Sequence, residues 1–325
     1  MLKEAMLRNV VFRVGVCFIL HSCSVLAFDL AKSPRIDPLK VLESYTLPAV
    51  EISGMTWRTN PETKRREIVV VGDRDFRVTF FDWENRKRDF SPRSVDLRFL
   101  FPGAAANPGS QSEWESISSD ESGRLFIVRE SPAEVLIISA DLKRLEGRIT
   151  LTGKINSDRN SGGEGMVLLK NGHLLVVKEK NPIQLLEFAS EGKVAEGYRA
   201  DLSIERGGRF PPIGVSPVSY VPVFTWEFSP EVEALFEDSS GVNLDPAGAL
   251  YLLGDQKNLV ARLGPKLEAN KAKIQVERFW SLPSEIKHPE GMVIDSEDRP
   301  IISVDRKNTK SPNLFLLTSV RDGSK

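Results

Sequence analysis

Short, almost continuously apolar segments recur along the chain, and an acidic residue follows each of them within two positions. They are Leu125–Val128, Leu174–Val177, Leu250–Leu253 and Ile301–Val304. Apolar runs this short, bounded by turn-forming residues, are typical of strands buried on both faces. Helical spacing of the apolar positions occurs only around Pro230–Phe236. The pattern therefore predicts an all-β fold.

A four-residue signature ending in a small residue precedes each of these strands, and one more copy lies upstream. The five copies are Glu51-Ile-Ser-Gly54, Glu113-Trp-Glu-Ser116, Gly162-Gly-Glu-Gly165, Asp238-Ser-Ser-Gly241 and His288-Pro-Glu-Gly291. In the last four copies, the small residue stands 14 positions before the acid that follows the apolar strand. In the first copy, Gly54 and Asp73 are 19 positions apart, because a charged run lengthens the loop. Equal spacing of this kind predicts a repeated hairpin unit.

The shortest interval between repeats is about 50 residues, which fits small four-stranded sheets arranged radially. We therefore expect a β-propeller with five recognisable blade repeats, and five or six blades in all. A sixth, degenerate blade has room in an insertion at about residues 199–236. The segment around 41–47 is expected to complete the last blade and close the ring. Residues 28–325 are expected to form a single domain.

The first 27 residues differ from the rest of the chain. Basic residues precede an apolar run from Val14 to Ala27, which closes with small residues. This pattern predicts a secretory signal peptide over 1–27, and hence a periplasmic or cell-envelope protein. The alternative is a lipoprotein signal ending at Cys23, which His21 in the preceding motif fits less well. No other stretch is apolar and long enough to span a bilayer.

Composition removes several classes of chemistry. Both cysteines, Cys17 and Cys23, lie in the expected signal peptide, so the mature chain would lack disulfides and thiol nucleophiles. A formal net charge of −1 gives no reason to expect nucleic acid as a partner. With 3 histidines and no nucleophile-elbow motif, neither a transition-metal site nor a Ser–His–Asp hydrolase is favoured.

Each blade contributes acidic residues in two tiers. The tier beside the small residue contains Glu51, Glu113, Glu115, Glu164, Asp238 and Glu290. The rim tier, which ends the following strand, contains Asp73, Glu130, Glu179, Asp255 and Asp305. Because the innermost strands of a propeller line its channel, we expect these side chains to converge. Converging carboxylates repel one another unless something compensates them.

Two kinds of compensation are open. One is Ca²⁺, which accepts about six to eight oxygen ligands in flexible geometry. Its expected ligands are Glu51, Glu115, Glu164, Asp238 and Glu290. Glu164 and Glu290 are the strongest candidates, because no base adjoins them in the sequence. The other kind is internal, from the bases next to the rim acids: Arg74, Arg129, Lys178, Lys180, Lys257 and Arg306.

Other side chains have both a functional and a plain structural interpretation. His288 could contact a ligand or lie at the surface, and His173 is expected to be exposed in a hairpin turn. Arg206 and Trp226 in the insertion could contact a ligand as part of a lid, or belong to a loop that covers an edge. For the repeated glycines we favour close approach of the innermost strands over ligand contact.

The five signatures, in this order, resemble those of the SdiA-regulated family of exported bacterial proteins. Lys178-Glu-Lys-Asn-Pro182 is similar to a further stretch of that family. The family includes calcium-regulated β-propeller proteins and is distantly similar to phytase-like esterase propellers. The resemblance implies a propeller fold, an envelope location and a link to calcium. The chain departs from the pattern at Ser116 and in its insertion at 199–236.

Two functions remain as hypotheses. The first is an exported binding or scaffold protein that holds Ca²⁺ through its channel carboxylates, with a small molecule or an envelope protein as undefined partner. The alternative is a metal-dependent hydrolase of phosphoesters or lactone-type esters, with a ring carboxylate as general base. Propellers serve many functions, so the fold alone does not decide between them.

Overall fold

The computed structural model describes residues 34–107, 109–153, 155 and 162–321. The chain divides into Met1–Pro34 and Arg35–Lys325, and every strand described here lies in the second unit. The expected signal peptide at 1–27 falls outside the described residues.

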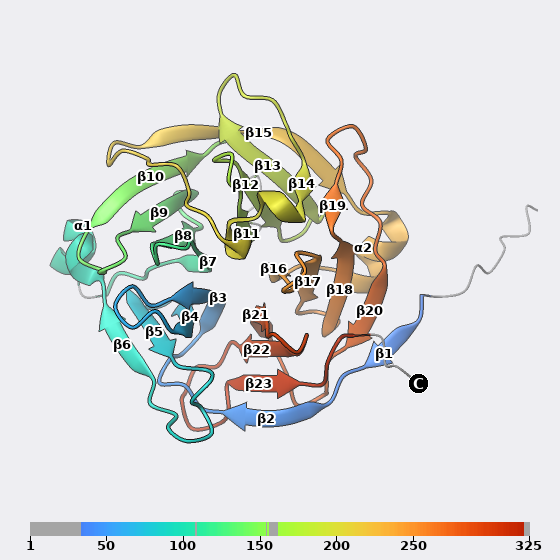
Figure 1. Cartoon of the computed structure of the whole chain (residues 1–325), viewed down its shortest axis with the longest axis horizontal. Coiled ribbons are helices and arrows are strands. Elements are labelled where there is room, and N and C mark those ends of the chain that lie inside the picture. Colours follow the sequence, from blue (N-terminus) through green and yellow to red (C-terminus); the bar gives the residue numbers. More distant parts are fainter. Residues whose placement is uncertain (1–33, 108, 154, 156–161, 322–325) are drawn as a thin grey trace, which may run out of the picture. The chain divides into compact units, whose positions relative to one another are not determined.

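Four-stranded antiparallel units surround a central axis (Figure 1), as expected for a β-propeller. The first unit is β3 (Ile52–Thr59), β4 (Arg66–Gly72), β5 (Arg77–Phe81) and β6 (Arg93–Asp96). The second is β7 (Trp114–Ser119), β8 (Leu125–Arg129), β9 (Glu134–Ile138) and β10 (Leu145–Leu151). The third is β11 (Gly163–Leu168), β12 (Leu174–Lys178), β13 (Gln184–Ser190) and β15 (Val218–Glu227).

The remaining strands complete the ring. The fourth unit is β16 (Gly241–Leu244), β17 (Leu250–Gly254), β18 (Leu259–Gly264) and β20 (Arg278–Ser281), and β1 (Ile36–Pro38) pairs with β20 in parallel. The fifth unit is β21 (Pro289–Ile294), β22 (Pro300–Val304), β23 (Leu314–Leu317) and β2 (Val41–Tyr45). Strand β2 pairs antiparallel with β23, so the segment around 41–47 closes the ring as expected.

The second strands of the units are buried on both faces, as their apolar runs predict. Leu125, Phe126, Ile127 and Val128 of β8 are each at most 1% exposed. Phe126 and Val128 pack with residues of β11 and β12 in the next unit. The core is therefore a series of layers between neighbouring sheets.

The innermost strands β3, β7, β11, β16 and β21 contact one another in sequence and enclose the central channel. Their signature glycines permit this close approach. A Cβ atom on Gly165 would lie 2.3 Å from the backbone nitrogen of Val242, and one on Gly54 would lie 2.8 Å from the Cα of Ser116. The expected packing role of these glycines agrees with this geometry.

The insertion at 199–236 supplies an outer strand and a cover for one end of the channel. It contains η3 (Ala200–Leu202), η4 (Ile204–Arg206), β15 and α2 (Pro230–Phe236), and its described residues form no separate four-stranded unit. Just before it, β14 (Tyr198–Arg199) pairs with β19 (Lys266–Leu267). Strand β15 also pairs in parallel with β10, which links the second and third units into one sheet.

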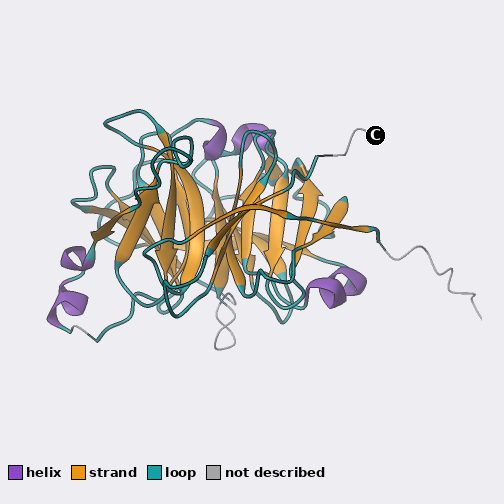
Figure 2. Ribbon diagram, turned by 90° about the horizontal axis from the view of Figure 1, so that it is seen from below, coloured by secondary structure: helices purple, strands orange, loops and turns teal. Residues whose placement is uncertain are grey.

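Seen from the side, the strands run between two faces that carry the loops and short helices (Figure 2). The loop before β7 contains η1 (Arg98–Leu100) and α1 (Pro102–Ala106). None of the helices described is long and apolar enough to cross a membrane.

Candidate cation site

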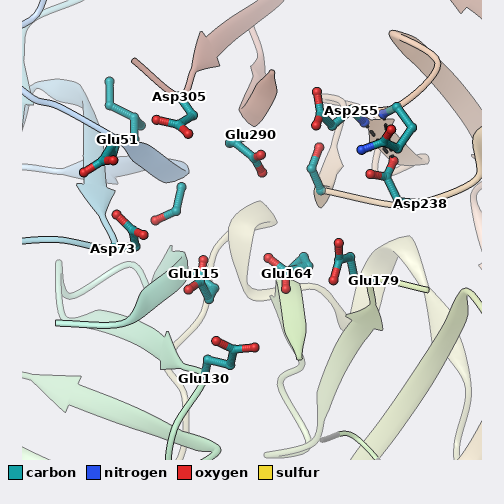
Figure 3. Close-up of a pocket in the computed structure, with 14 residues that line it drawn as sticks. Glu51, Asp73, Glu115, Glu130, Glu164, Glu179, Asp238, Asp255, Glu290 and Asp305 are labelled. Atoms are coloured by element: carbon teal, nitrogen blue, oxygen red, sulfur yellow. Dashed lines mark hydrogen bonds between the residues drawn. The ribbon is translucent and has the colours of Figure 1, made fainter. Parts of the chain in front are cut away.

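Both tiers of acids meet at one end of the channel. In each unit the first two strands are antiparallel, so the start of the innermost strand and the end of the second strand share an edge. At that edge lies a cavity of about 320 Å³, which we call the acidic cavity (Figure 3). Its ten carboxylates are those of Glu51, Asp73, Glu115, Glu130, Glu164, Glu179, Asp238, Asp255, Glu290 and Asp305.

A bulge in the innermost strand sets the position of three central carboxylates. The pairing register shifts between Trp114 and Ser116, between Gly163 and Gly165, and between Pro289 and Gly291. The extra residue in each case is a glutamate: Glu115, Glu164 or Glu290. A bulge leaves one residue outside the ladder and redirects its side chain. These three glutamates line the cavity for that reason.

Serine occupies the same repeat position in the other two units, and sequence reasoning did not single it out. Ser53 donates its hydroxyl hydrogen bond to the carbonyl of Trp114, and Ser240 donates to the carbonyl of Pro289 at 2.6 Å. Both serines line the acidic cavity. Each therefore fixes its unit to the following one where other units place a carboxylate. Aligning the five signatures by position is the signal that reveals them.

Burial and mutual repulsion raise the pKa of several of these carboxyl groups. Burial, followed by the charges of neighbouring acids, raises the pKa of Glu115 to about 8. The same causes hold the pKa values of Glu164 and Glu290 well above the usual range. Burial raises the pKa of Asp73 to about 6, against the attraction of Arg74. It also raises the pKa values of Glu179, Asp238 and Asp305.

Internal compensation reaches only part of the cavity. Arg74 Nε lies 2.8 Å from a carboxylate oxygen of Glu51, and Lys180 Nζ lies 2.6 Å from one of Glu179. Asp238 is stabilised differently, because it accepts backbone hydrogen bonds from Asp255 and Gln256 at 3.0 and 3.1 Å.

The other bases that we expected to offset the rim acids point elsewhere. Arg129 pairs with Glu134 at 2.6 Å, and Lys257 pairs with Glu237 at 2.7 Å. Lys178 donates to the carbonyl of Lys180 at 2.6 Å, and the Arg306 guanidinium stands 6.0 Å from the centre of the Phe315 ring. The partners in these four contacts are groups other than the rim acids.

The inner end of the acidic cavity is closed. The residues that follow the signature glycines and Ser116 are apolar and buried, among them Met55, Ile117 and Met292. Together with Glu164 and Glu290 they line a void of about 10 Å³, no larger than one water needs. We call this narrow part of the channel the waist.

The acids form a wide cup. In the described ranges, no group of three or more acidic, cysteine or histidine side chains is spaced so that it could hold a metal ion as the side chains stand. The donor chemistry nevertheless suits a hard cation, because the cavity lining offers carboxylate oxygens from all five units.

Five further residues singled out in the sequence lie elsewhere. Glu113 is not part of the lining of the acidic cavity, and its backbone amide donates to the carbonyl of Asp73 at 2.8 Å. Trp226 is 1% exposed in the core, and the exposed Arg206 lies outside the lining of the acidic cavity. His288 is largely exposed, with its Nδ1 3.4 Å from Asp255. The expectation for His173 is wrong: it is 4% exposed and lies 2.6 Å from the buried carboxylate of Glu187.

Several solved structures are similar to this chain at low identity. The PQQ-bound form of aldose sugar dehydrogenase from Streptomyces coelicolor is 10% identical, covering 88% of this chain and 99% of that one, with a TM-score of 0.44. Glutaminyl cyclase from Myxococcus xanthus is 11% identical, covering 88% and 98%, with a TM-score of 0.46. Similarity at such low sequence identities and TM-scores gives no evidence about activity. No curated protein matches the chain.

A match to a protein family agrees with the repeated signatures. The model of the SdiA-regulated family matches residues 106–316, which contain four of the five signatures. The match also spans eight of the ten carboxylates of the acidic cavity, all except Glu51 and Asp73 of the first unit. This chain is a β-propeller that belongs to the SdiA-regulated family.

Proposed function

We propose that this protein is an exported binding protein whose acidic cavity holds a hard divalent cation, Ca²⁺. The observation that carries the proposal is the meeting of ten carboxylates in one cavity, among which Glu51 pairs with Arg74 and Glu179 with Lys180. Export rests on the pattern of residues 1–27 alone.

The electrostatics support a cation. A buried carboxyl group with a raised pKa is unfavourable in its charged form, and the penalty falls when a positive charge binds beside it. Glu115, Glu164 and Glu290 meet this description, and they come from three different units. A bound cation would therefore link the units as well as offset their charge.

The chemistry of the donors favours Ca²⁺ over other ions. Calcium accepts carboxylate, carbonyl and water oxygens in flexible geometry, whereas Mg²⁺ requires a near-ideal octahedron. A wide cup lined by carboxylates suits the flexible ion, with water as a further ligand. Glu115, Glu164 and Glu290 are the residues that would hold it, and Glu51 and Asp238 are the other expected ligands.

Thermal unfolding tests the proposal. Wild-type protein, Glu164→Gln and Glu290→Gln are melted in Ca²⁺ and in chelator. Binding to the native state alone stabilises it by RT ln(1 + [L]/Kd), so Tm rises with the concentration of the ligand. We expect a calcium-dependent increase in Tm for the wild type and a much smaller one for both variants. Glu191→Gln, an exposed acid outside the cavity lining, serves as control. A wild type whose Tm ignores calcium would overturn the proposal.

One observation favours the hydrolase as a second candidate. Glu115 has a carboxyl pKa of about 8, which suits proton transfer near neutral pH. A bound cation would supply Lewis-acid polarisation of a phosphoester or lactone. Turnover of such esters by calcium-loaded protein, abolished by Glu290→Gln, would support catalysis. No turnover by the calcium-loaded wild type would exclude catalysis, and equal turnover by wild type and variant would exclude this cavity as its site.

A further inference from the structure

A segment of the insertion crosses the end of the channel opposite the acidic cavity. Residues 198–210 are hydrogen-bonded there to the hairpin turns of three units. The contacts are with the amides of Glu121 and Lys170, at 3.0 and 2.8 Å, and with the carbonyl of Ala247, at 2.8 Å. The segment is therefore fixed over this end, which we call the hairpin end.

The local structure of the segment places one acidic side chain at a second cavity. Ser203 caps η4 by accepting a hydrogen bond from the amide of Glu205 at 3.2 Å. Ile204 is buried in the core, and Gly207 ends the turn at φ +96°. Held between these two residues, Glu205 lines a cavity of about 140 Å³.

A cationic side chain lies on another wall of the same cavity. The guanidinium of Arg66 lies over the indole ring of Trp57, 4.0 Å from the ring centre. Trp57 is itself held by a hydrogen bond from its Nε1 to the carbonyl of Ile294 at 2.9 Å. The stacked arginine presents its planar donors to the cavity from a fixed support.

In the part of the chain that the structure describes, neither of these two charges has a close partner. Among the described residues, no hydrogen bond or ion pair reaches the Arg66 guanidinium or the Glu205 carboxylate, and they are not paired with each other. The other charged groups of the lining are engaged: Arg58 with Glu67, Asp120 with Arg124, and Glu121 with Arg209. Burial raises the pKa of Glu205 to about 7, against the attraction of Arg66.

We propose that this cavity is a second ligand site, for a small zwitterion such as a free amino acid. The ligand carboxylate would accept paired hydrogen bonds from the planar guanidinium of Arg66, and the ligand ammonium group would donate to the carboxylate of Glu205. Paired, charge-assisted hydrogen bonds of this kind are the strong ones. One water needs about 10 to 15 Å³, so 140 Å³ admits several waters or one small organic molecule. The waist separates this site from the acidic cavity.

Calorimetric titration of the whole protein tests the site. The probes are glycine, β-alanine and γ-aminobutyrate, in which the two charges lie progressively further apart, with acetate and methylammonium as single-charge comparisons. We expect at least one zwitterion to bind, and Arg66→Gln and Glu205→Gln to weaken it at least about tenfold. Arg65→Gln and Glu191→Gln, both at exposed positions outside this cavity, should bind as the wild type does.

Further variants keep the test decisive. Arg66→Lys keeps the charge and loses the planar fork, so it should weaken binding less than Arg66→Gln. Glu164→Gln in the acidic cavity should leave zwitterion binding unchanged, which separates this site from the proposed calcium site. The proposal fails if no zwitterion binds, if acetate binds as tightly, or if a folded Glu205→Gln keeps full affinity.

Discussion

Both ends of the channel carry acidic side chains, but the two sets of acids differ in their hydrogen-bond and ion-pair partners. At the hairpin end, Asp120 and Asp295 each accept hydrogen bonds from the amides of their own turn and pair with an arginine four positions on. In the acidic cavity, no hydrogen bond or ion pair to Glu115, Glu164 or Glu290 is found within the described ranges. Satisfied acids stabilise the turns, whereas buried acids without a partner destabilise the folded protein.

The largest effect is expected from removing a satisfied acid. Asp120→Ala would remove the closest carboxylate partner of Arg124, whose side chain is 14% exposed, and the acceptor for the amide of Phe210. Breaking such a pair costs about 3 to 5 kcal/mol. Urea unfolding measures this loss in the free energy of unfolding, and Glu164→Gln in the acidic cavity is the comparison. Equal losses of stability in both variants would show that the acids at the two ends do not differ in their contribution to stability.

The waist that separates the ends is the next target. Gly165→Ala would bring a Cβ to 2.3 Å from a backbone atom of β16 that has little room to move. Overpacking of this kind costs about 1 to 3 kcal/mol. Gly103→Ala is the matched control, because nothing lies within 4 Å of a Cβ there. Similar unfolding midpoints for the two variants would show that the glycines are not needed for close packing.

The dependence of stability on pH sharpens the comparison. Because the native pKa of Glu115 is about 8 against an ordinary value of 4.5, the folded state holds a proton that the unfolded state has lost. The stability that this bound proton contributes is fully present below about pH 4.5 and is lost as pH rises through about 8, by at most about 1.4 kcal/mol per pH unit. In chelator, Glu115→Gln should therefore gain stability relative to wild type from pH 5 to pH 8. Parallel profiles would contradict the raised pKa.

The smallest effect is expected at the rim. Lys180→Gln removes a partly exposed ion pair with Glu179, worth less than about 1 kcal/mol. It also leaves the acidic cavity more negative, so calcium should bind more tightly. Lys257→Gln is the control, because its partner Glu237 lies outside the cavity lining. Weaker calcium binding by Lys180→Gln than by the control would argue against a cation site.

The repeat spacing predicts much of this site from the sequence. A constant step of 14 residues places the start of one strand and the end of the next at a common edge, so ten of the eleven acids in the two tiers meet there. The glycines and the closure by residues 41–47 follow from the same repeat.

The partners of the acids were harder to predict. Arg129 and Glu130 are neighbours at the end of a strand, where successive side chains point to opposite faces, so adjacency did not imply pairing. Arg129 instead reaches Glu134, its cross-strand neighbour on β9. The turn pattern of Asp120 with Arg124, repeated at Asp295 with Arg299, was a readable signal that sequence reasoning missed.

The insertion resisted prediction because its partners lie far away in the sequence. Glu205 stands beside Arg206 in the sequence, yet it shares a cavity with Arg66, which is almost 140 positions earlier. Trp226 packs in the core because β15 pairs with β13, and no local sequence pattern predicts that pairing.

The pairing of β2 with β23 also constrains the order of folding. Val41 meets Leu317, so the fifth sheet contains segments from near both ends of the described chain. A chain that emerges from its amino end can build the intermediate sheets early, but β2 stays an unpaired edge until the final strand arrives. Ring closure is then the last step of folding. A chain interrupted before β23 would expose the unpaired edge of β2, which is prone to aggregation, and would lack a complete ring of carboxylates.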